Sequence, residues 1–129
     1  NIGVSNVNLQ QLETLCELSS VKPMVVQNRC YADRAWDQEV RDFCKQNSIL
    51  YQGFSLLTAN PAVYKIREIG QIASKYHMTI GQLIFRFSSQ LGIIPLTGTT
   101  DPIHMEEDLK VFEFTLTEDE INLIETCMI

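Results

Sequence analysis

The sequence has no long hydrophobic run and no cluster of basic residues. Polar residues interrupt every apolar stretch, and no basic start precedes an apolar run, so neither a membrane span nor a secretory signal is predicted. Ten lysines and arginines stand against sixteen aspartates and glutamates, which gives a net charge of -6. Nucleic-acid binding depends on attraction between basic side chains and phosphates. We therefore expect a soluble cytoplasmic protein that binds neither nucleic acid nor membrane.

The sequence also lacks the spacings of metal and disulfide sites. No Cys-x-x-Cys pair occurs, and three of the four cysteines lie among apolar, periodic positions, which predicts buried free thiols in a reducing compartment. His77 and His104 are far apart and have no metal-type neighbours, so we expect solvated histidines and no metal site. The cysteines are Cys16, Cys30, Cys44 and Cys127.

Three glycine motifs are missing as well. There is no Gly-x-Gly-x-x-Gly, no Gly-Lys-Ser/Thr phosphate loop and no Gly-x-Ser-x-Gly turn. These absences exclude a Rossmann dinucleotide domain, a P-loop enzyme and an α/β-hydrolase.

What the sequence does contain is an alternation of short apolar runs and helical patterns, in a chain of 129 residues that is 45% hydrophobic. Four runs read as strands: Ile2 to Val4, Met24 to Gln27, Ile49 to Gly53 and Ile93 to Leu96. Each is followed by at least one helix. The helical patterns comprise Leu9, Leu12 and Cys16; Trp36, Val40, Phe43 and Cys44; Val63, Ile66, Ile69, Ala73 and Tyr76; and Ile80, Leu83, Ile84, Phe87 and Leu91.

Helix starts near the C-terminal end have recognisable caps. Thr79 with Gln82 and Thr117 with Glu120 match the capping box, and Asp101-Pro102 places proline in a first turn. The helix after Asp101 has Met105, Leu109 and Phe112 as its apolar face, and the last helix has Ile121, Ile124 and Met128.

Strands that alternate with helices predict an α/β fold of parallel βα units. An eight-unit TIM-type barrel takes about 250 residues, or roughly 31 per unit, so this chain has room for about four units. We expect a single domain, residues 1–129, that forms half of a (β/α)8 barrel with a C-terminal helix. Val4, Val25, Val26, Leu50, Ile93 and Ile94 fit strands covered on both faces. The spacing equally allows an open, doubly wound sheet of four strands.

Polar groups follow each predicted strand, at the edge where α/β proteins bind ligands. Amides and hydroxyls suit a carboxamide, an aromatic ring suits a flat heterocycle, and a Thr/Gly turn before a helix suits a phosphate. Taken singly, each group is also typical of a turn, a helix cap or a core position. Together they predict a nicotinamide dinucleotide site. The groups are Ser5-Asn6, Gln27-Asn28, Phe54-Ser55 and Thr97 to Thr100.

These segments resemble the aldo-keto reductase family over nearly the whole chain. The resemblance implies the second half of a TIM-type barrel that binds NADPH or NADH and reduces aldehydes and ketones by hydride transfer. The segments that look like the family's fifth to eighth strands are Ile2 to Asn6, Lys22-Pro23 with Val26 to Asn28, Gln52 to Leu57, and Ile94 to Thr100. The helix with His104, Glu107, Asp108 and Leu109 looks like its adenosine-binding helix, and Phe112 to Leu116 like its closing segment.

The resemblance also implies a role for individual residues. Phe54 stands where the family usually has tyrosine and would stack on the nicotinamide ring. The other implied contacts are Ser5, Asn6 and Gln27 to the carboxamide; Ser55 and Leu57 along the pyrophosphate; Thr97, Gly98 and Thr99 to phosphate and ribose; and Glu107 and Asp108 to adenine.

Two positions depart from the family at the 2′-phosphate of NADPH. His104 stands where an arginine often clamps that phosphate, and Leu96 where a lysine often helps. A titratable and an apolar side chain cannot form the same charge-assisted pairs. We therefore expect little preference for NADPH over NADH.

The family's catalytic Asp, Tyr, Lys and His belong to the first four βα units, which have no counterpart here. Tyr31, Tyr51, Tyr64 and Tyr76 stand in no matching context. The sequence therefore predicts the cofactor-binding half of a reductase, truncated or separate from its catalytic half, that binds nucleotide weakly and is not catalytic alone. The alternative is a non-catalytic nucleotide-binding or protein-interaction module with the same fold.

A half-barrel leaves both edge strands unpaired and its inner face open. Such edges and apolar faces favour association with another chain. We expect a homodimer that buries Val26, Leu50 and Ile94 more deeply, unless a missing N-terminal half covers them.

Overall fold

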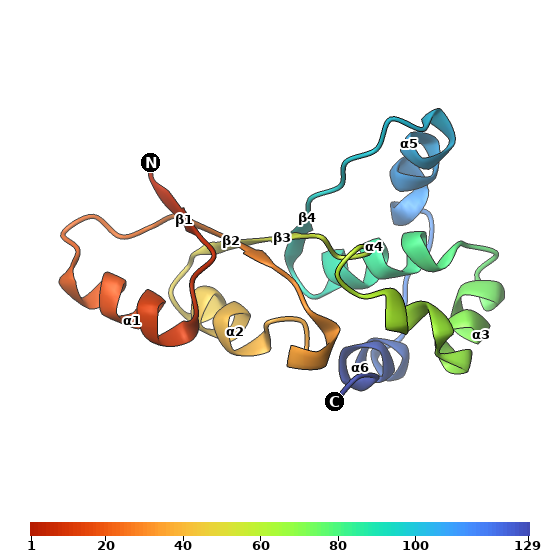
Figure 1. Ribbon diagram of the computed structural model, residues 1–129, viewed down its shortest axis with the longest axis horizontal. Helices are drawn as coiled ribbons and strands as arrows, with labels where there is room; N and C mark the ends of the chain where they lie inside the picture. Colours follow the sequence, from red (N-terminus) through yellow and green to blue (C-terminus); the bar gives the residue numbers. More distant parts are fainter.

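Four short strands form one parallel sheet, in the order in which they occur along the chain. The computed structural model describes residues 1–129. The strands are β1 (Gly3–Ser5), β2 (Val25–Arg29), β3 (Leu50–Phe54) and β4 (Ile93–Pro95) (Figure 1). Since an open, doubly wound sheet would begin with an inner strand and continue outward in both directions, the sequential order confirms the half-barrel prediction and is inconsistent with the open sheet.

The helices lie mainly on one side of this sheet. Figure 1 shows α1, α2, α3, α4 and α6 on the same side, with α5 apart from them beyond β4. Their bounds are α1 Leu9–Leu18, α2 Gln38–Gln46, α3 Arg67–Lys75, α4 Ile80–Gln90, α5 Pro102–Leu109 and α6 Glu118–Thr126, with 3-10 turns at η1 Ala32–Arg34, η2 Pro61–Lys65 and η3 Lys110–Phe112. None of the helices has the length and hydropathy needed to cross a membrane.

Side chains alternate between the two faces of the sheet. Val26, Tyr51 and Ile93 are paired in register, belong to the hydrophobic core and face the helices. On each strand, the residues before and after these positions point to the opposite, inner face. Leu50 and Ile94 are 55% and 39% exposed there. Apolar residues thus occupy both faces, as predicted, but this chain covers only one of them. The expectation that a partner buries Val26 more deeply is wrong, because Val26 is already fully buried.

The predicted helix starts are confirmed. Thr79 with Gln82 and Thr117 with Glu120 form complete capping boxes, and the Asp101 carboxylate accepts a hydrogen bond from the Ile103 backbone N–H. These bonds satisfy donors that every helix leaves free in its first turn.

Two helical patterns are shorter than predicted. Trp36 precedes α2 instead of belonging to it, because Ala35, Trp36 and Asp37 all have a left-handed backbone, with φ of 48°, 56° and 62°. The pattern from Val63 to Tyr76 is divided at Ile66, whose extended backbone separates η2 from α3. Side-chain spacing was helical in both places, but the backbone turns between helical segments.

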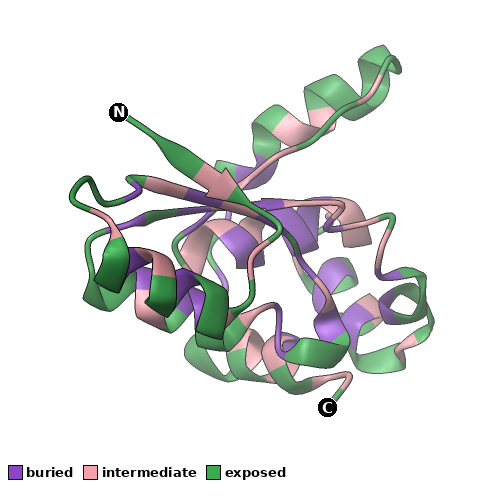
Figure 2. Ribbon diagram, turned by 60° about the vertical axis from the view of Figure 1, so that its left-hand side comes forward, coloured by how far each residue is buried: buried purple, intermediate pink, exposed green.

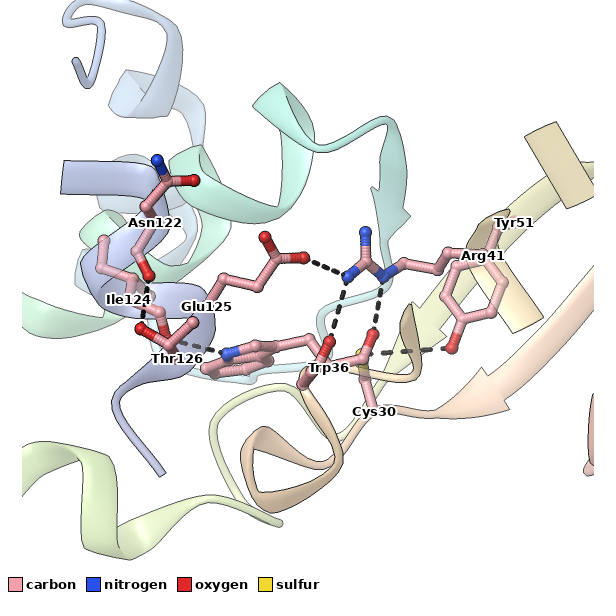
Figure 3. Close-up of polar contacts among 9 residues, drawn as sticks. Cys30, Trp36, Arg41, Tyr51, Asn122, Ile124, Glu125 and Thr126 are labelled. Atoms are coloured by element: carbon pink, nitrogen blue, oxygen red, sulfur yellow. Dashed lines mark hydrogen bonds and ion pairs between the residues drawn. The ribbon is translucent and has the colours of Figure 1, made fainter. Parts of the chain in front are cut away.

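The turn at Trp36 contacts the C-terminal helix α6. The Trp36 indole N–H donates to the Ile124 carbonyl in α6 at 3.1 Å, and the ring meets Phe87 edge-on at 5.2 Å between centroids. Arg41 donates to the Trp36 carbonyl at 2.7 Å and pairs with Glu125 at 2.6 Å. Figure 3 shows the polar contacts that join Trp36 and Arg41 to α6.

A second polar link joins α3 to α6. Lys75 and the Tyr76 hydroxyl donate to the two carboxylate oxygens of Glu120 at 2.6 and 2.7 Å. Burial alone would raise the pKa of Glu120, but hydrogen bonds from Lys75, the Thr117 backbone and Tyr76 outweigh it and lower this pKa to about 2. Glu120 therefore stays ionised far below neutral pH.

All four cysteines are free, and three of them are buried, as the spacing predicts. Burial raises the pKa of the Cys30 and Cys44 thiols to about 12. Both thiols are therefore protonated at neutral pH and pack as small apolar groups.

The predicted apolar face of α5 remains exposed. No residue of this helix is buried, and Met105, Leu109 and Phe112 are 49%, 81% and 70% exposed. Figure 2 shows α5 as exposed or intermediate along its length. The helix covers no part of the sheet.

We expect Trp36→Phe to lower the free energy of unfolding by about 3 kcal/mol, because it leaves the buried Ile124 carbonyl without a donor and opens a gap beside Phe87. Urea unfolding followed by far-UV circular dichroism measures this loss. Phe112→Leu, at an exposed aromatic, should leave the midpoint unchanged. An equal midpoint for both variants would contradict the role of Trp36.

Candidate functional site

The carboxyl ends of the four strands meet at one edge of the sheet, where three hollows overlap. The first, here called the arginine hollow, has a volume of about 530 Å³ and is lined by Asn6, Val7, Asn8, Gln11, Asn28, Arg29, Tyr31, Arg34, Asp37 and Phe54.

The other two hollows continue along the same edge. The central hollow, of about 370 Å³, is lined by Phe54, Ser55, Leu56, Leu57, Thr58, Phe85, Leu96, Thr97 and Gly98. The α5 hollow, of about 350 Å³, is lined by Leu57, Tyr64, Thr79, Ile80, Gly81, Gln82, Phe85, Thr97, Gly98, Thr99, His104, Glu107 and Asp108. Phe54 joins the first hollow to the second, and Leu57, Phe85, Thr97 and Gly98 join the second to the third.

The fold brings most of the predicted site residues together along this run of hollows. Asn6 lines the arginine hollow, and Phe54 lies between it and the central hollow. The remaining ones line the central hollow, the α5 hollow or both: Ser55, Leu57, Thr97, Gly98, Thr99, His104, Glu107 and Asp108. Ser5 and Gln27 line none of the three hollows.

Ser5 and Gln27 instead lie on the inner face of the sheet, paired in register. The Gln27 side-chain amide donates to the Gln52 amide oxygen at 2.9 Å. The sequence reasoning missed Gln52, although the period of two along β3 places it on the same face as Leu50 and Phe54. The inner face therefore presents two linked carboxamides just below the edge.

Two strand ends turn through a left-handed backbone. Asn6 follows β1 with φ of 56°, and Ser55 follows β3 with φ of 55°. Asparagine tolerates this conformation, whereas serine adopts it at a cost. The Asn6 N–H donates to the Gln27 carbonyl at 3.1 Å, and the Ser55 carbonyl accepts from Ala59 at 2.9 Å, which fixes both turns. Strain of this kind is concentrated at functional sites.

A buried polar cluster supports the edge from the helical side. Asn28 is 5% exposed, and its amide donates to the Val7 carbonyl at 2.7 Å and to the Asp37 carboxylate at 2.8 Å. The Tyr51 hydroxyl donates to the same Asp37 oxygen at 2.6 Å. Burial, together with the neighbouring Cys30 and Asp37, raises the pKa of Tyr51 far above its ordinary value. Tyr51 is thus a fixed donor that holds Asp37, whose side chain also lines the arginine hollow.

The α5 hollow is acidic and held together by hydrogen bonds. The Thr97 hydroxyl donates to Asp108 at 2.9 Å, and the Gln82 side chain donates to the Glu107 carbonyl at 3.0 Å, which ties α4 to α5. His104 is exposed, and its Nδ1 lies 4.0 Å from an Asp101 oxygen. Burial raises the pKa of Tyr64 on the opposite wall. An imidazole is the one basic side chain in this hollow.

The arginine and central hollows meet at a stacked pair. The Arg29 guanidinium carbon lies 5.5 Å from the centre of the Phe54 ring, and the two residues are in register across β2 and β3. No lysine lines any of the three hollows. No group of three histidine, cysteine or acidic side chains is arranged to hold a metal ion.

Taken together, the edge offers a flat aromatic ring, side-chain amides, hydroxyls and a glycine turn along an extended path. Such groups can hold an elongated polar ligand with a flat ring at one end. They include no tyrosine–lysine pair that could deliver a proton to a carbonyl oxygen.

Comparison with known proteins gives consistent matches along the chain. The family model described as "Aldo/keto reductase family" matches residues 1–129. The chain is 31% identical over 124 residues to the uncharacterized oxidoreductase YtbE of Bacillus subtilis (strain 168), which covers 96% of this chain and 44% of that protein.

Solved structures agree with this match. MGS-M4, an aldo-keto reductase from a Medee basin deep-sea metagenome library, superposes with a TM-score of 0.88 at 28% identity, over 97% of this chain and 46% of that one. A Bombyx mori aldo-keto reductase in complex with NADP superposes with a TM-score of 0.84 at 25% identity, over 96% of this chain and 43% of that one. The chain spans less than half the length of these relatives.

We expect Ser55→Gly to raise the free energy of unfolding by about 1 kcal/mol, because glycine adopts a left-handed backbone without strain. Chemical denaturation at neutral pH measures the change. The same substitution at exposed Ser74, within α3, should instead lower stability by about 0.5 kcal/mol. A loss of stability at both positions would contradict the strain at Ser55.

Proposed function

Because this chain belongs to the aldo/keto reductase family, we propose that it is the cofactor-binding half of an NAD(P)H-dependent reductase of aldehydes or ketones. The observation that carries the proposal is the continuous run of hollows from Asn6, past Phe54 and Ser55, to Asp108. Its length and its change from aromatic to acidic lining suit a dinucleotide in an extended conformation.

The nicotinamide end lies at Phe54 in this proposal. The Phe54 ring would stack on the nicotinamide, and Asn6 lies at the same end of the run. Ser5, Gln27 and Gln52 supply hydroxyl and amide groups on the inner face beside Phe54. A hydroxyl, donors and acceptors in this arrangement fit a ring-bound carboxamide, and the bound nicotinamide would supply the hydride.

The phosphate and adenosine end extends into the α5 hollow. Ser55 and Leu57 line the path of the pyrophosphate, and Thr97, Gly98 and Thr99 supply hydroxyls and a backbone without a Cβ for phosphate and ribose. Glu107 and Asp108 would face the adenine. The relative from Bombyx mori in complex with NADP supports this choice of cofactor class.

The hollows of this half contain no tyrosine with a neighbouring lysine to supply the proton needed for carbonyl reduction. Reduction by hydride requires a general acid beside the carbonyl oxygen. Among the tyrosines, Tyr51 is buried against Asp37 on the helical side, and Tyr76 is bound to Glu120. We therefore propose that this chain binds the cofactor and is not catalytic by itself.

The alternative is a nucleotide-binding or protein-interaction module without catalysis. Sequencing the coding region upstream of Asn1 separates the two proposals. An in-frame segment with the family's Asp, Tyr, Lys and His supports the enzyme, whereas a start codon next to Asn1 supports the module. Free cysteines are typical of reducing compartments, so in both cases we propose a cytoplasmic location.

The open inner face supports a partner for this chain. Leu50 and Ile94 are 55% and 39% exposed there. The edge strands β1 and β4 each pair on one side only, and both run in the same direction. A two-fold axis along the strands would place β4 of one copy beside β1 of the next, with parallel pairing. We propose that a second copy covers this face when no N-terminal half is present.

The cofactor proposal predicts weak binding with little preference between NADPH and NADH at pH 8. His104→Arg should strengthen NADPH binding roughly tenfold at pH 8. Calorimetric titration measures both effects.

The matched control for this titration is Gln46→Arg. It adds the same charge at the end of α2, which lies toward the amino edge of the sheet because α2 leads back to the start of β3. This variant should bind NADPH and NADH as the unchanged chain does. A strong NADPH preference of the unchanged chain at pH 8 would contradict the roles given to His104 and Leu96.

Self-association predicts a dimer in solution at micromolar concentration. Replacing Leu50 and Ile94 by aspartate should give a monomer with unchanged helical content, because both side chains are exposed in the single chain. Light scattering measures the mass. Exposed Leu18→Asp, on α1, is the control and should leave the dimer intact. A folded monomer at high concentration that binds no dye for apolar surfaces would rule out this proposal.

A further inference from the structure

The arginine hollow concentrates positive charge in a chain whose net charge is -6. Arg29 and Arg34 both line it, and neither takes part in an ion pair, unlike Arg41, which is bound to Glu125. Asp37 is the only acidic side chain in the lining. Two unpaired guanidinium groups at one hollow leave an excess of charge that an anion would neutralise.

The single carboxylate is already engaged with the protein. One oxygen of Asp37 accepts hydrogen bonds from the Asn28 amide at 2.8 Å and from the Tyr51 hydroxyl at 2.6 Å. Both donors belong to the buried cluster on the helical side. Asp37 is thus held by neutral donors and is paired with neither arginine.

Each of the two arginines lies over an aromatic ring. The Arg29 guanidinium lies 5.5 Å from the centre of the Phe54 ring, and the Arg34 guanidinium lies 5.6 Å from the centre of the Tyr31 ring. Stacking uses the flat face of a guanidinium and leaves its N–H groups at the edge free to donate. Such a fork matches the two oxygens of a carboxylate.

Neutral donors add to this lining. Asn8 and Gln11 form the capping box of α1, in which each amide oxygen accepts from the backbone N–H of the other residue at 2.8 and 3.0 Å. Their NH2 groups are not used in these bonds. The hollow is therefore rich in donors, and the acceptors of its capping residues are already occupied.

We propose that the arginine hollow binds the carboxylate of the substrate, so that the preferred substrates are aldehydes or ketones that carry a carboxylate group. This inference rests on the proposed function, because it places the substrate beside the nicotinamide. Phe54 is the link: it lines both the arginine hollow and the central hollow. A carboxylate bound in this hollow would lie beside Phe54, the ring on which the nicotinamide would stack.

Malonate and its uncharged analogue malonamide test this proposal directly. Calorimetric titration of the chain at low ionic strength should detect binding of malonate and no binding of malonamide. Arg29→Gln and Arg34→Gln should each weaken malonate binding roughly tenfold. Arg67→Gln, at an exposed arginine of α3 without an ion pair, is the matched control and should leave the affinity unchanged.

A parallel titration of the same variants with NADP+ separates this inference from the proposed function. Both arginine variants should bind NADP+ as the unchanged chain does. Equal binding of malonate and malonamide, or malonate binding that ignores both substitutions, would overturn the carboxylate site even if NADP+ binds. A matching loss of NADP+ affinity would also overturn it, since the arginines would then hold the cofactor's phosphates. Malonate binding that needs both arginines, without any NADP+ binding, would retain the anion site and refute the proposed function.

Discussion

The parallel, sequential pairing of the four strands is the constraint on which the other features depend. Because each strand is followed by a crossover of the same hand, the covering helices collect on one face and all carboxyl ends meet at one edge. That geometry buries Val26 and exposes Leu50, one residue position apart in register on neighbouring strands. It also lines up Asn6, Phe54 and Thr97, which are far apart in sequence, along one path.

The sequence predicts those parts of the fold that depend on local rules. Strand runs, the capping boxes at Thr79 and Thr117 and the proline start at Pro102 depend on neighbours within a few residues. The three left-handed residues from Ala35 to Asp37 could not be predicted, because distant contacts compensate for their strain. Trp36 has helical spacing, yet its indole is fixed by α6, and no local pattern reveals a partner 88 positions away.

The candidate site also has parts that the sequence predicts and parts that it does not. Positions at strand ends were predictable, because parallel strands bring them to one edge, and the family resemblance gave them roles. Gln52 and the stacking of Arg29 on Phe54 depend on cross-strand register, which the sequence does not specify until the sheet is known. The sequence could not predict that the Asp37 carboxylate is hydrogen-bonded, because its donors Asn28 and Tyr51 come from two neighbouring strands.

The bond from Trp36 to Ile124 and the ion pair from Arg41 to Glu125 span 88 and 84 positions of the chain. During synthesis on a ribosome, the strand that leads to Trp36 is made long before α6 emerges. Until α6 emerges, Trp36 is therefore incompletely covered, and the core closes late. Contacts between residues so far apart in the sequence slow folding, so this half completes its fold only once α6 can reach Trp36 and Arg41.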